Sequence, residues 1–193
     1  MNAPEKLYPG IIAMLWIVWI LFWRVSALRT KATEQHESLA SRASHIIPLV
    51  IGVLLVAFPR VPPAWLHRPV SVDPLPLYWA GTALVAAGLA FSIWARRHLG
   101  ANWSATITLK EGHVLVRTGP YRWVRHPIYT GLLLAILGTA LSRNDWCPLL
   151  GFAIITAAFI RKLSIEERWM LGAFEVEYRQ YQANVPALIP FLF

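Results

Sequence analysis

Five apolar runs separated by polar segments set the pattern of this chain. They cover residues 10–28, 43–59, 75–95, 128–142 and 146–160. Apolar residues fill these runs almost without interruption, which is typical of helices that cross a membrane. The first run, as an α-helix, would cross most of a hydrocarbon layer about 30 Å thick. The pattern predicts an all-α integral membrane protein with about five transmembrane helices, in a single membrane domain covering residues 1–193.

Two of the runs also indicate how their helices face. Trp16, Trp19 and Trp23 in the first run suit a helix that faces lipid or the membrane interface. Gly81, Ala86, Ala87 and Gly88 give the third run small faces for close helix packing.

Three of the runs leave alternatives open. Residues 10–28 could be a cleaved signal peptide ending at Val25-Ser26-Ala27, but Arg24 interrupts the run just before that site. The last two runs are joined by the turn Arg143-Asn144-Asp145 and are short for full spans, so they could form a re-entrant pair. The charge distribution favours two spans.

The polar segments between the runs carry an uneven charge. A long polar loop covers residues 98–127, and a helix with one apolar face is expected over residues 161–183. With the N-terminus outside, the segments on the inner side hold four, six and four Lys or Arg residues, which is fourteen of the eighteen. This is a strong positive-inside bias, and it predicts that the loop and the C-terminal helix are both cytoplasmic.

Composition narrows the function classes. The chain is 56% hydrophobic, has ten tryptophans, and carries a formal charge of +8. The arginines lie at the ends of the apolar runs and form no basic patch, so nucleic acid is not expected as a partner. One cysteine, Cys147, and six scattered histidines predict no disulfide and no metal site. The sequence contains no GxGxxG, Walker A or GxSxG motif.

The polar segment 112–131, GHVLVRTGPYRWVRHPIYTG, holds most of the candidate chemistry. Pro127 suits the first turn of a helix, because that position needs no backbone N–H partner. Each of these residues also has a purely structural alternative. Its tyrosines could be interfacial anchors, and His126 could do no more than cap the helix start. Arg122 and Arg125 could simply contact lipid headgroups. The pair Glu166-Glu167 could be an ordinary solvated helix start.

The same segment, followed by a helical hairpin, then EER, then FEVEYRQYQANVPALIP, resembles the isoprenylcysteine carboxyl methyltransferases. It is also similar to the related membrane phospholipid methyltransferases, and GANWSATITLKEG fits the prokaryotic branch. The resemblance covers about residues 99–190. It implies a bundle of membrane helices in which the cytosolic loop and C-terminal helix form an S-adenosylmethionine pocket, and a lipid substrate that enters from the bilayer.

The resemblance also implies site residues. The residues that would contact the cofactor are His113, Val114, Leu115, Val116, Tyr121, His126, Pro127, Ile128, Tyr129, Glu166 and Glu167. Lys162 aligns with a basic residue that faces the substrate, where an arginine is usual, and Arg161 is its neighbour. The family often has a glycine where this chain has Glu175.

The chemistry of these residues suits methyl transfer. Glu166 can pair with the cationic end of the cofactor, and the two tyrosines can flank the adenine or the sulfonium. An acceptor carboxylate is already ionised and needs only positioning by Lys162 or Arg161. An amine or thiol acceptor would need a base, for which His126 or a glutamate is the candidate.

The sequence therefore predicts an S-adenosylmethionine-dependent methyltransferase of a prokaryotic cytoplasmic membrane. Its expected acceptor is the carboxylate of an isoprenylcysteine or a similar lipid. Three alternatives remain: a phospholipid or small-molecule N- or S-methyltransferase, an NADPH-dependent membrane reductase with a similar Arg-x-Pro-x-Tyr-x-Gly region, and a non-catalytic membrane protein.

Overall fold

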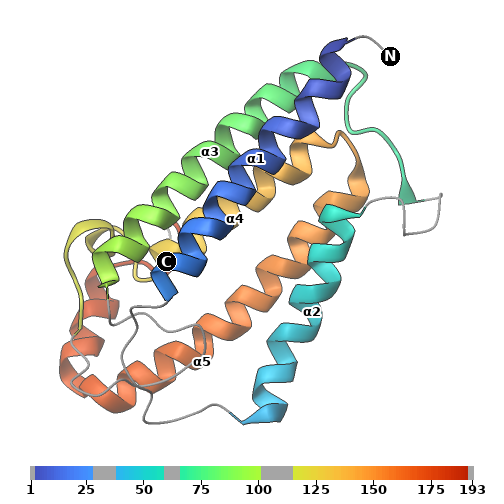
Figure 1. Cartoon of the computed structure of the whole chain (residues 1–193). Helices are drawn as coiled ribbons and strands as arrows, with labels where there is room; N and C mark the ends of the chain where they lie inside the picture. The colour runs from blue at the N-terminus through green and yellow to red at the C-terminus, as the bar shows by residue number, and fades with distance from the viewer. Residues whose placement is uncertain (1–2, 28–37, 59–65, 101–114, 191–193) are drawn as a thin grey trace.

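A computed structural model describes residues 3–27, 38–58, 66–100 and 115–190, and in these residues all regular elements are helical (Figure 1). The elements are α1 (Ala3–Ala27), α2 (Leu39–Ala57), α3 (Pro74–Leu99), the short 3-10 helix η3 (Gly119–Arg122), α4 (Pro127–Ser142) and α5 (Trp146–Asn184). Helices α1, α3 and α4 lie together, and α2 lies along α5 (Figure 1).

Glycines bring α3 and α4 into close backbone contact. A Cβ atom at Gly81 would lie 2.3 Å from the carbonyl oxygen of Gly138, and one at Gly88 would lie 2.4 Å from that of Gly131. Small residues allow this approach where lipid provides no hydrophobic drive for helix association. The prediction that Gly81 and Gly88 form a packing face is confirmed. The same prediction for Ala86 and Ala87 is wrong, because both are exposed, on the other side of α3.

Helix α1 is attached to this pair by tryptophans. Trp16 Nε1 donates to Thr139 Oγ1 over 3.0 Å, and Trp19 Nε1 donates to Ser92 Oγ over 2.8 Å. Trp16 and Trp19, expected to face lipid or the membrane interface, are half-buried against the bundle. The indole N–H groups explain the difference, because a buried indole needs a hydrogen-bond acceptor and α3 and α4 supply one each.

Four of the described helices, α1, α2, α3 and α5, are long and apolar enough to cross a membrane. The protein is therefore a multi-pass membrane protein, and the predicted all-α membrane fold is confirmed. The fifth apolar helix, α4, has 16 residues, which is about 24 Å at 1.5 Å per residue. That length is slightly short of the hydrocarbon layer.

Helix α5 continues well beyond its apolar part. The sequence predicts a span over residues 146–160 and a separate helix over 161–183, whereas α5 runs from Trp146 to Asn184 and changes direction at Glu175. Glu175 has φ 31° and ψ −100°, a conformation that side chains other than glycine rarely adopt. Beyond this kink the chain folds back toward the start of α4 (Figure 1).

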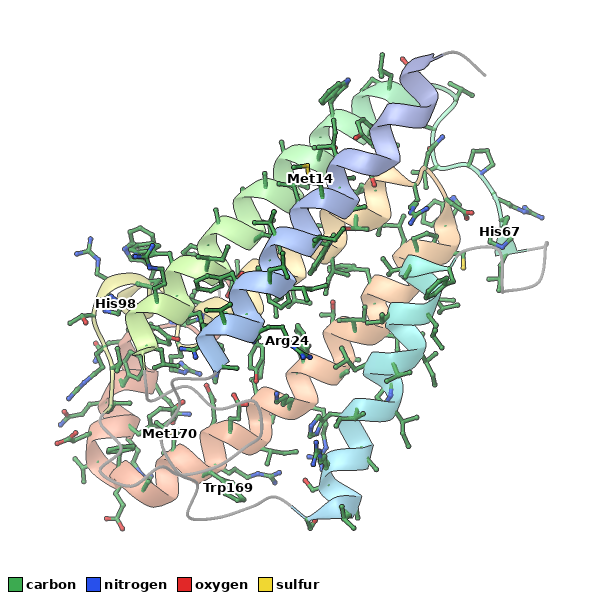
Figure 2. All side chains as sticks on the ribbon, viewed as in Figure 1. Met14, Arg24, His67, His98, Trp169 and Met170 are labelled. Carbon is green, nitrogen blue, oxygen red and sulfur yellow. The ribbon has the colours of Figure 1, made fainter. Side chains whose placement is uncertain are left out.

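The two ends of the bundle are both polar. Arg24, His98, Trp169 and Met170 lie toward one end, and His67 lies at the opposite end (Figure 2). At the His67 end, His67 Nδ1 is 2.7 Å from Asp145 Oδ2. The amide of Asn144 donates to Ser71 O and accepts from Ser71 N, both over 2.8 Å. These contacts join the segment before α3 to the turn between α4 and α5.

Candidate active site

The candidate site begins at the turn that precedes α4. Gly119 has φ 59°, and a Cβ atom there would lie 2.7 Å from the His98 ring. His98 Nε2 is 2.8 Å from Thr118 Oγ1. Glycine therefore meets both a backbone and a space requirement at position 119, and η3 is held against the end of α3.

Residues 185–188 cross the start of α4 and pair with it. The backbone N–H of Arg125 donates to Pro186 O over 2.9 Å, and that of His126 donates to Ala187 O over 3.0 Å. Thr130 Oγ1 donates to Leu188 O over 2.6 Å. The segment beyond α5 thus fixes the backbone from which the Arg125 and His126 side chains project.

Glu167 is the centre of the polar network. Its Oε1 accepts from Arg125 Nε over 2.7 Å and is 3.1 Å from His126 Nε2, while its Oε2 accepts from Gln182 Nε2 over 3.0 Å. Burial raises the pKa of this carboxyl, but the hydrogen bonds from His126 and Arg125 outweigh it and hold the pKa at about 2. Both oxygens are engaged by the protein, so Glu167 positions its neighbours.

Glu166 has a different environment. Tyr129 Oη donates to its Oε1 over 2.6 Å, Lys162 Nζ lies 3.9 Å from the same oxygen, and His126 Nδ1 lies 3.8 Å from Oε2. Its side chain is 25% exposed, against 15% for that of Glu167. Glu166 is therefore an anion at the edge of the network, next to an aromatic ring and a cation.

Three tyrosines close the network on the side of the turned-back helix. Tyr121, Tyr178 and Tyr181 are buried, and Tyr181 Oη donates to the carbonyl of Tyr121. Burial, followed by the nearby Tyr181 and Glu166, raises the pKa of the Tyr121 phenol well above its usual range. These phenols stay protonated at any physiological pH, and that of Tyr181 serves as a hydrogen-bond donor.

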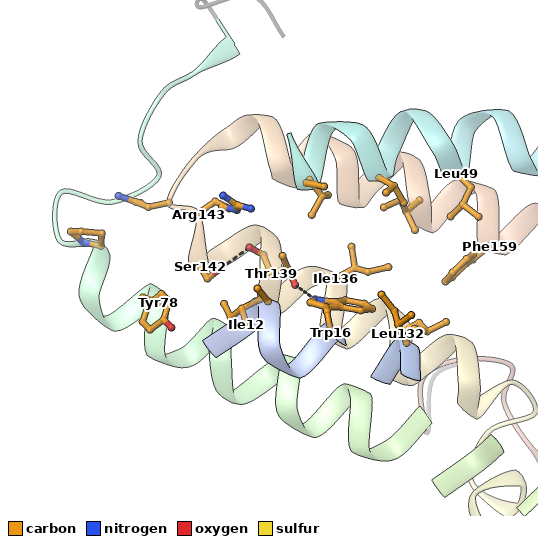
Figure 3. A pocket seen from close by; sticks show the side chains of 18 of the residues that line it. Ile12, Trp16, Leu49, Tyr78, Leu132, Ile136, Thr139, Ser142, Arg143 and Phe159 are labelled. Atoms are coloured by element: carbon orange, nitrogen blue, oxygen red, sulfur yellow. Dashed lines mark hydrogen bonds between the residues drawn. The ribbon is translucent and has the colours of Figure 1, made fainter. Parts of the chain in front are cut away.

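An apolar pocket of about 820 Å³ lies inside the bundle (Figure 3). It is lined by α1, α2, α4, α5 and the start of α3, and Leu132 and Phe159 line its end nearest the network. The Phe159 ring is 5.0 Å from the ring of Tyr129, measured between centroids. Tyr129 therefore contacts both Phe159, in the wall of the pocket, and Glu166.

The structure brings five of the predicted site residues together: His126, Tyr129, Lys162, Glu166 and Glu167. Pro127 and Ile128 form the first turn of α4 beside them. Leu115 and Val116 are half-buried just before η3, and Tyr121 is buried under Tyr181. Arg161 is exposed. His113 and Val114 are outside the described residues.

Two of the purely structural roles considered for this segment, those of His126 and Arg125, are wrong. His126 occupies the position before the first turn of α4, but its side chain makes no capping hydrogen bond and points to Glu167. Arg125, considered as a headgroup contact, has a side chain only 10% exposed and bonded to Glu167 and to the carbonyls of Gln182 and Val185.

Sequence reasoning missed Arg125, Gln182 and Tyr181 as members of the network. Their positions in the quoted segments RHPIYTG and YRQYQ were the available signal. In the part of the chain that the structure describes, no group of three His, Cys, Asp or Glu side chains is arranged to hold a metal ion.

Comparison with known proteins identifies the family. A family model described as phospholipid methyltransferase matches residues 76–177, more than half of the chain. This range includes α4, the carboxylate pair and most of α5. The chain belongs to the phospholipid methyltransferase family. The predicted relationship is confirmed by curated relatives as well.

Three of these relatives carry the same kind of name. A protein-S-isoprenylcysteine O-methyltransferase of Schizosaccharomyces pombe is 31% identical over 116 residues, which are 60% of this chain and 45% of the relative. That of Saccharomyces cerevisiae is 32% identical over 58% of this chain and 48% of its own length. Enzyme B of Arabidopsis thaliana is 30% identical over 58% and 52%. The chain spans about half the length of the curated relatives it matches.

A solved structure is also similar. It is that of a eukaryotic intramembrane Ras methyltransferase, an isoprenylcysteine carboxyl methyltransferase. The TM-score is 0.51 at 25% identity, and the match covers 79% of this chain and 52% of the other. The likeness extends beyond the region matched by the family model, so the membrane helices share an arrangement as well as a motif.

Proposed function

We propose that this protein is a membrane methyltransferase that uses S-adenosylmethionine to esterify the carboxylate of a lipid-tailed acceptor, such as an isoprenylcysteine. The observation that carries the proposal is the position of Tyr129, whose ring lies 5.0 Å from that of Phe159 in the wall of the apolar pocket and whose hydroxyl donates to Glu166, with Lys162 and His126 beside it. A lipid tail suits the pocket, and a charged reactive group suits the cluster. The names of the similar enzymes support the same activity.

The residues fit the proposed cofactor, which when bound supplies an activated methyl group on a sulfonium. Glu166 offers a partly exposed anion for a cationic group, and Tyr129 offers an aromatic face beside it. Leu115 and Val116, with His113 and Val114 before them, would bind the adenine through their backbone. Tyr121, His126, Pro127, Ile128 and Glu167 would shape the pocket around it.

Lys162 is the residue assigned to the acceptor. Its Nζ lies 5.5 Å above the Tyr129 ring, 3.9 Å from Glu166, and its side chain is 18% exposed. A carboxylate is ionised at neutral pH, so the protein needs only to orient it, and a cation beside Tyr129 could do this. Arg161 is exposed and is the matched control.

The test is an assay of the purified protein with labelled S-adenosylmethionine and a prenylated cysteine acceptor. We expect a labelled, base-labile methyl ester. Lys162→Ala should lower kcat/KM for the acceptor about tenfold or more, as expected for loss of a charged hydrogen bond, with little change in cofactor affinity. Arg161→Ala should behave like the wild type. Calorimetry that shows NADPH binding and no S-adenosylmethionine binding would exclude the proposal.

A second candidate acceptor is an amine, as in a phospholipid headgroup. His126 lies between the two carboxylates, 3.1 Å from Glu167 and 3.8 Å from Glu166, so it could accept a proton from an amine. The same assay with aminophospholipids distinguishes the two, because a methylated amine is stable to base and an ester is not.

We further propose that the N-terminus is outside, and the site cytoplasmic, in a prokaryotic membrane. The positive-inside bias supports this orientation, and Arg24, Arg96, Arg125 and Lys162 are all near the site end of the bundle. In a Cys147→Ala background, Arg168→Cys should be labelled from the cytoplasm and Arg143→Cys from outside. Labelling of position 143 from the cytoplasm alone would make the α4–α5 hairpin re-entrant.

A further inference from the structure

The apolar pocket is not uniform along its length. Near the candidate site its walls are aliphatic and aromatic, with Leu49, Leu132 and Phe159. At the other end the walls include Ser142, Arg143 and Asn144. Trp16 lies between these two ends (Figure 3). The pocket therefore has an inner compartment suited to a hydrocarbon tail and an outer compartment that is partly polar.

Trp16 is held firmly at this boundary. Its Nε1 donates to Thr139 Oγ1 over 3.0 Å, and its ring meets the edge of Trp19 at 5.7 Å between centroids. Trp19 is itself fixed by Ser92 Oγ at 2.8 Å and by stacking on Trp23. A side chain with a hydrogen bond and aromatic packing loses both if it moves.

Trp16 also connects two parts of the core. It packs against a cluster formed by α1, α3 and α4, which includes Ile12, Tyr78 and Leu89. It packs as well against a second cluster formed by α2, α4 and α5, which includes Val56 and Ile155. Among the described residues, it is the one shared by both clusters. The indole thus lines the pocket at the place where the two halves of the bundle meet.

We propose that Trp16 sets the maximum length of the acceptor tail. The inference rests on the proposed function, since it assumes that the reactive group of the acceptor lies near Lys162 and its tail lies in the inner compartment. Leu132 and Thr139 are seven residues apart on α4, so the inner compartment is about 10 Å long. A longer tail would have to displace the indole or contact the polar walls beyond it, and each costs free energy.

The test compares acceptors that share one headgroup and whose tails lengthen by one isoprene unit at a time. For the wild type we expect kcat/KM to fall sharply beyond one tail length. Trp16→Ala should move this limit to a longer tail, with a gain of about tenfold or more for the first tail that the wild type rejects, in line with the selectivity of apolar pockets. Trp16→Phe, which keeps much of the bulk but loses the hydrogen bond, should relax the limit less than Trp16→Ala.

Two further variants separate tail length from general damage. Thr139→Val removes the hydrogen bond and keeps the shape, so it should relax the limit less than Trp16→Ala. Trp94→Ala removes a tryptophan of α3 that is 41% exposed and outside the pocket lining, and should leave the limit unchanged. If Trp16→Ala is too unstable to purify, Trp16→Leu replaces it.

Binding is measured in parallel, by competition of the same tails with a fluorescent single-chain fatty acid. A tail-length limit that moves in both assays supports the proposed role of Trp16. An unchanged limit in Trp16→Ala or Trp16→Leu, an equal loss for all tails, or a wild type without any limit overturns it. If no acceptor is methylated but substitution of Trp16 still shifts the limit in the binding assay, the role of Trp16 in tail length is supported and the proposed methyltransferase function fails.

Discussion

The two polar ends of the bundle use similar residue types in different ways. At one end, Asp145 and Asn144 bind His67, Ser71 and the start of α5. At the other end, Glu167 and Glu166 bind Arg125, His126, Tyr129 and Lys162. The first end is built mainly from bonds between side chains and backbone. The second consists largely of bonds between side chains, several of them charged.

This difference separates a structural end from the end that we propose as the active site. Asn144 has φ 49°, which asparagine tolerates, and its amide is used in both directions by Ser71. Asp145 accepts from Cys147 N as the cap of α5. At the candidate site Glu167 is saturated in the same way, but Glu166 keeps a more exposed carboxylate. A ligand is expected to bind where a carboxylate, such as that of Glu166, is not fully used by hydrogen bonds within the fold.

The largest expected effect is on stability. Glu167→Ala removes the anion that faces Arg125 and His126, and loss of one partner of a buried pair costs about 3–5 kcal/mol of unfolding free energy. Denaturant unfolding in mixed micelles measures it. Glu177→Ala breaks a pair with Arg117 whose side chains are 63% and 44% exposed, and should cost less than about 1 kcal/mol. Equal effects of the two variants would contradict the central role of Glu167.

Acid should weaken the same end of the molecule. The pKa of Glu167 is lowered from 4.5 to about 2, so its stabilisation is fully present above pH 4.5 and is lost as the pH falls through about 2. The full loss is about 3 kcal/mol by linkage. Glu167→Gln should flatten this part of the stability curve, measured by thermal unfolding across the pH range. An acid transition of the same size in Glu167→Gln would assign it to other groups.

Glu166→Ala tests the other carboxylate. We expect a loss of about 1.5–3 kcal/mol in affinity for S-adenosylmethionine, because a bound cation loses its charged partner. Stability should change little, since Tyr129 can turn its hydroxyl to water. Calorimetry in detergent gives both the affinity and the stoichiometry. Unchanged affinity would show that the cationic end of the cofactor binds a group other than Glu166.

Asp145→Ala disturbs only the structural end. Loss of the α5 cap should cost about 1 kcal/mol of stability, and removal of the contact to His67 adds to it. Binding of S-adenosylmethionine should stay at the wild-type value. A variant with weakened cofactor binding and normal stability would show that the two ends are coupled.

The smallest effect is expected at the kink of α5. Glu175 has a positive φ, so Glu175→Gly should raise the unfolding free energy by roughly 1 kcal/mol by removing backbone strain. Glu175→Ala keeps the strain and is the control. Thermal unfolding of the two variants measures the difference. A stabilised alanine variant would point to the side chain charge and not to the backbone.

Much of the fold followed from hydropathy. The five apolar runs predicted the apolar helices, and the spacing of Gly81 and Gly88 predicted close packing. Hydropathy did not predict that Trp16 and Trp19 face the bundle and that Ala86 and Ala87 face away from it. A helix with apolar residues on all faces gives no sign of which face packs against protein. The continuity of α5 past Ile160 was also hidden, since a change in polarity looks the same with or without a break.

For the candidate site, the sequence indicated residue types but not their partners. Glu166 and Glu167 are adjacent, and only the direction of each along α5 decides that one meets Tyr129 and the other meets Arg125. Gln182 reaches Glu167 because the chain reverses at Glu175, an irregular feature that periodicity cannot predict. Assignments of this kind depend on contacts between residues far apart in the chain.

The pairing of residues 186–188 with the start of α4 has a consequence for how the protein is made. Helices α1 to α4 are synthesised before these residues. The backbone N–H groups of Arg125 and His126 therefore lack their native acceptors, the carbonyls of Pro186 and Ala187, until the last part of the segment is translated. The bundle can therefore insert before the site exists. A nascent chain arrested ahead of residue 185 would hold the membrane helices but lack the backbone acceptors of Arg125 and His126.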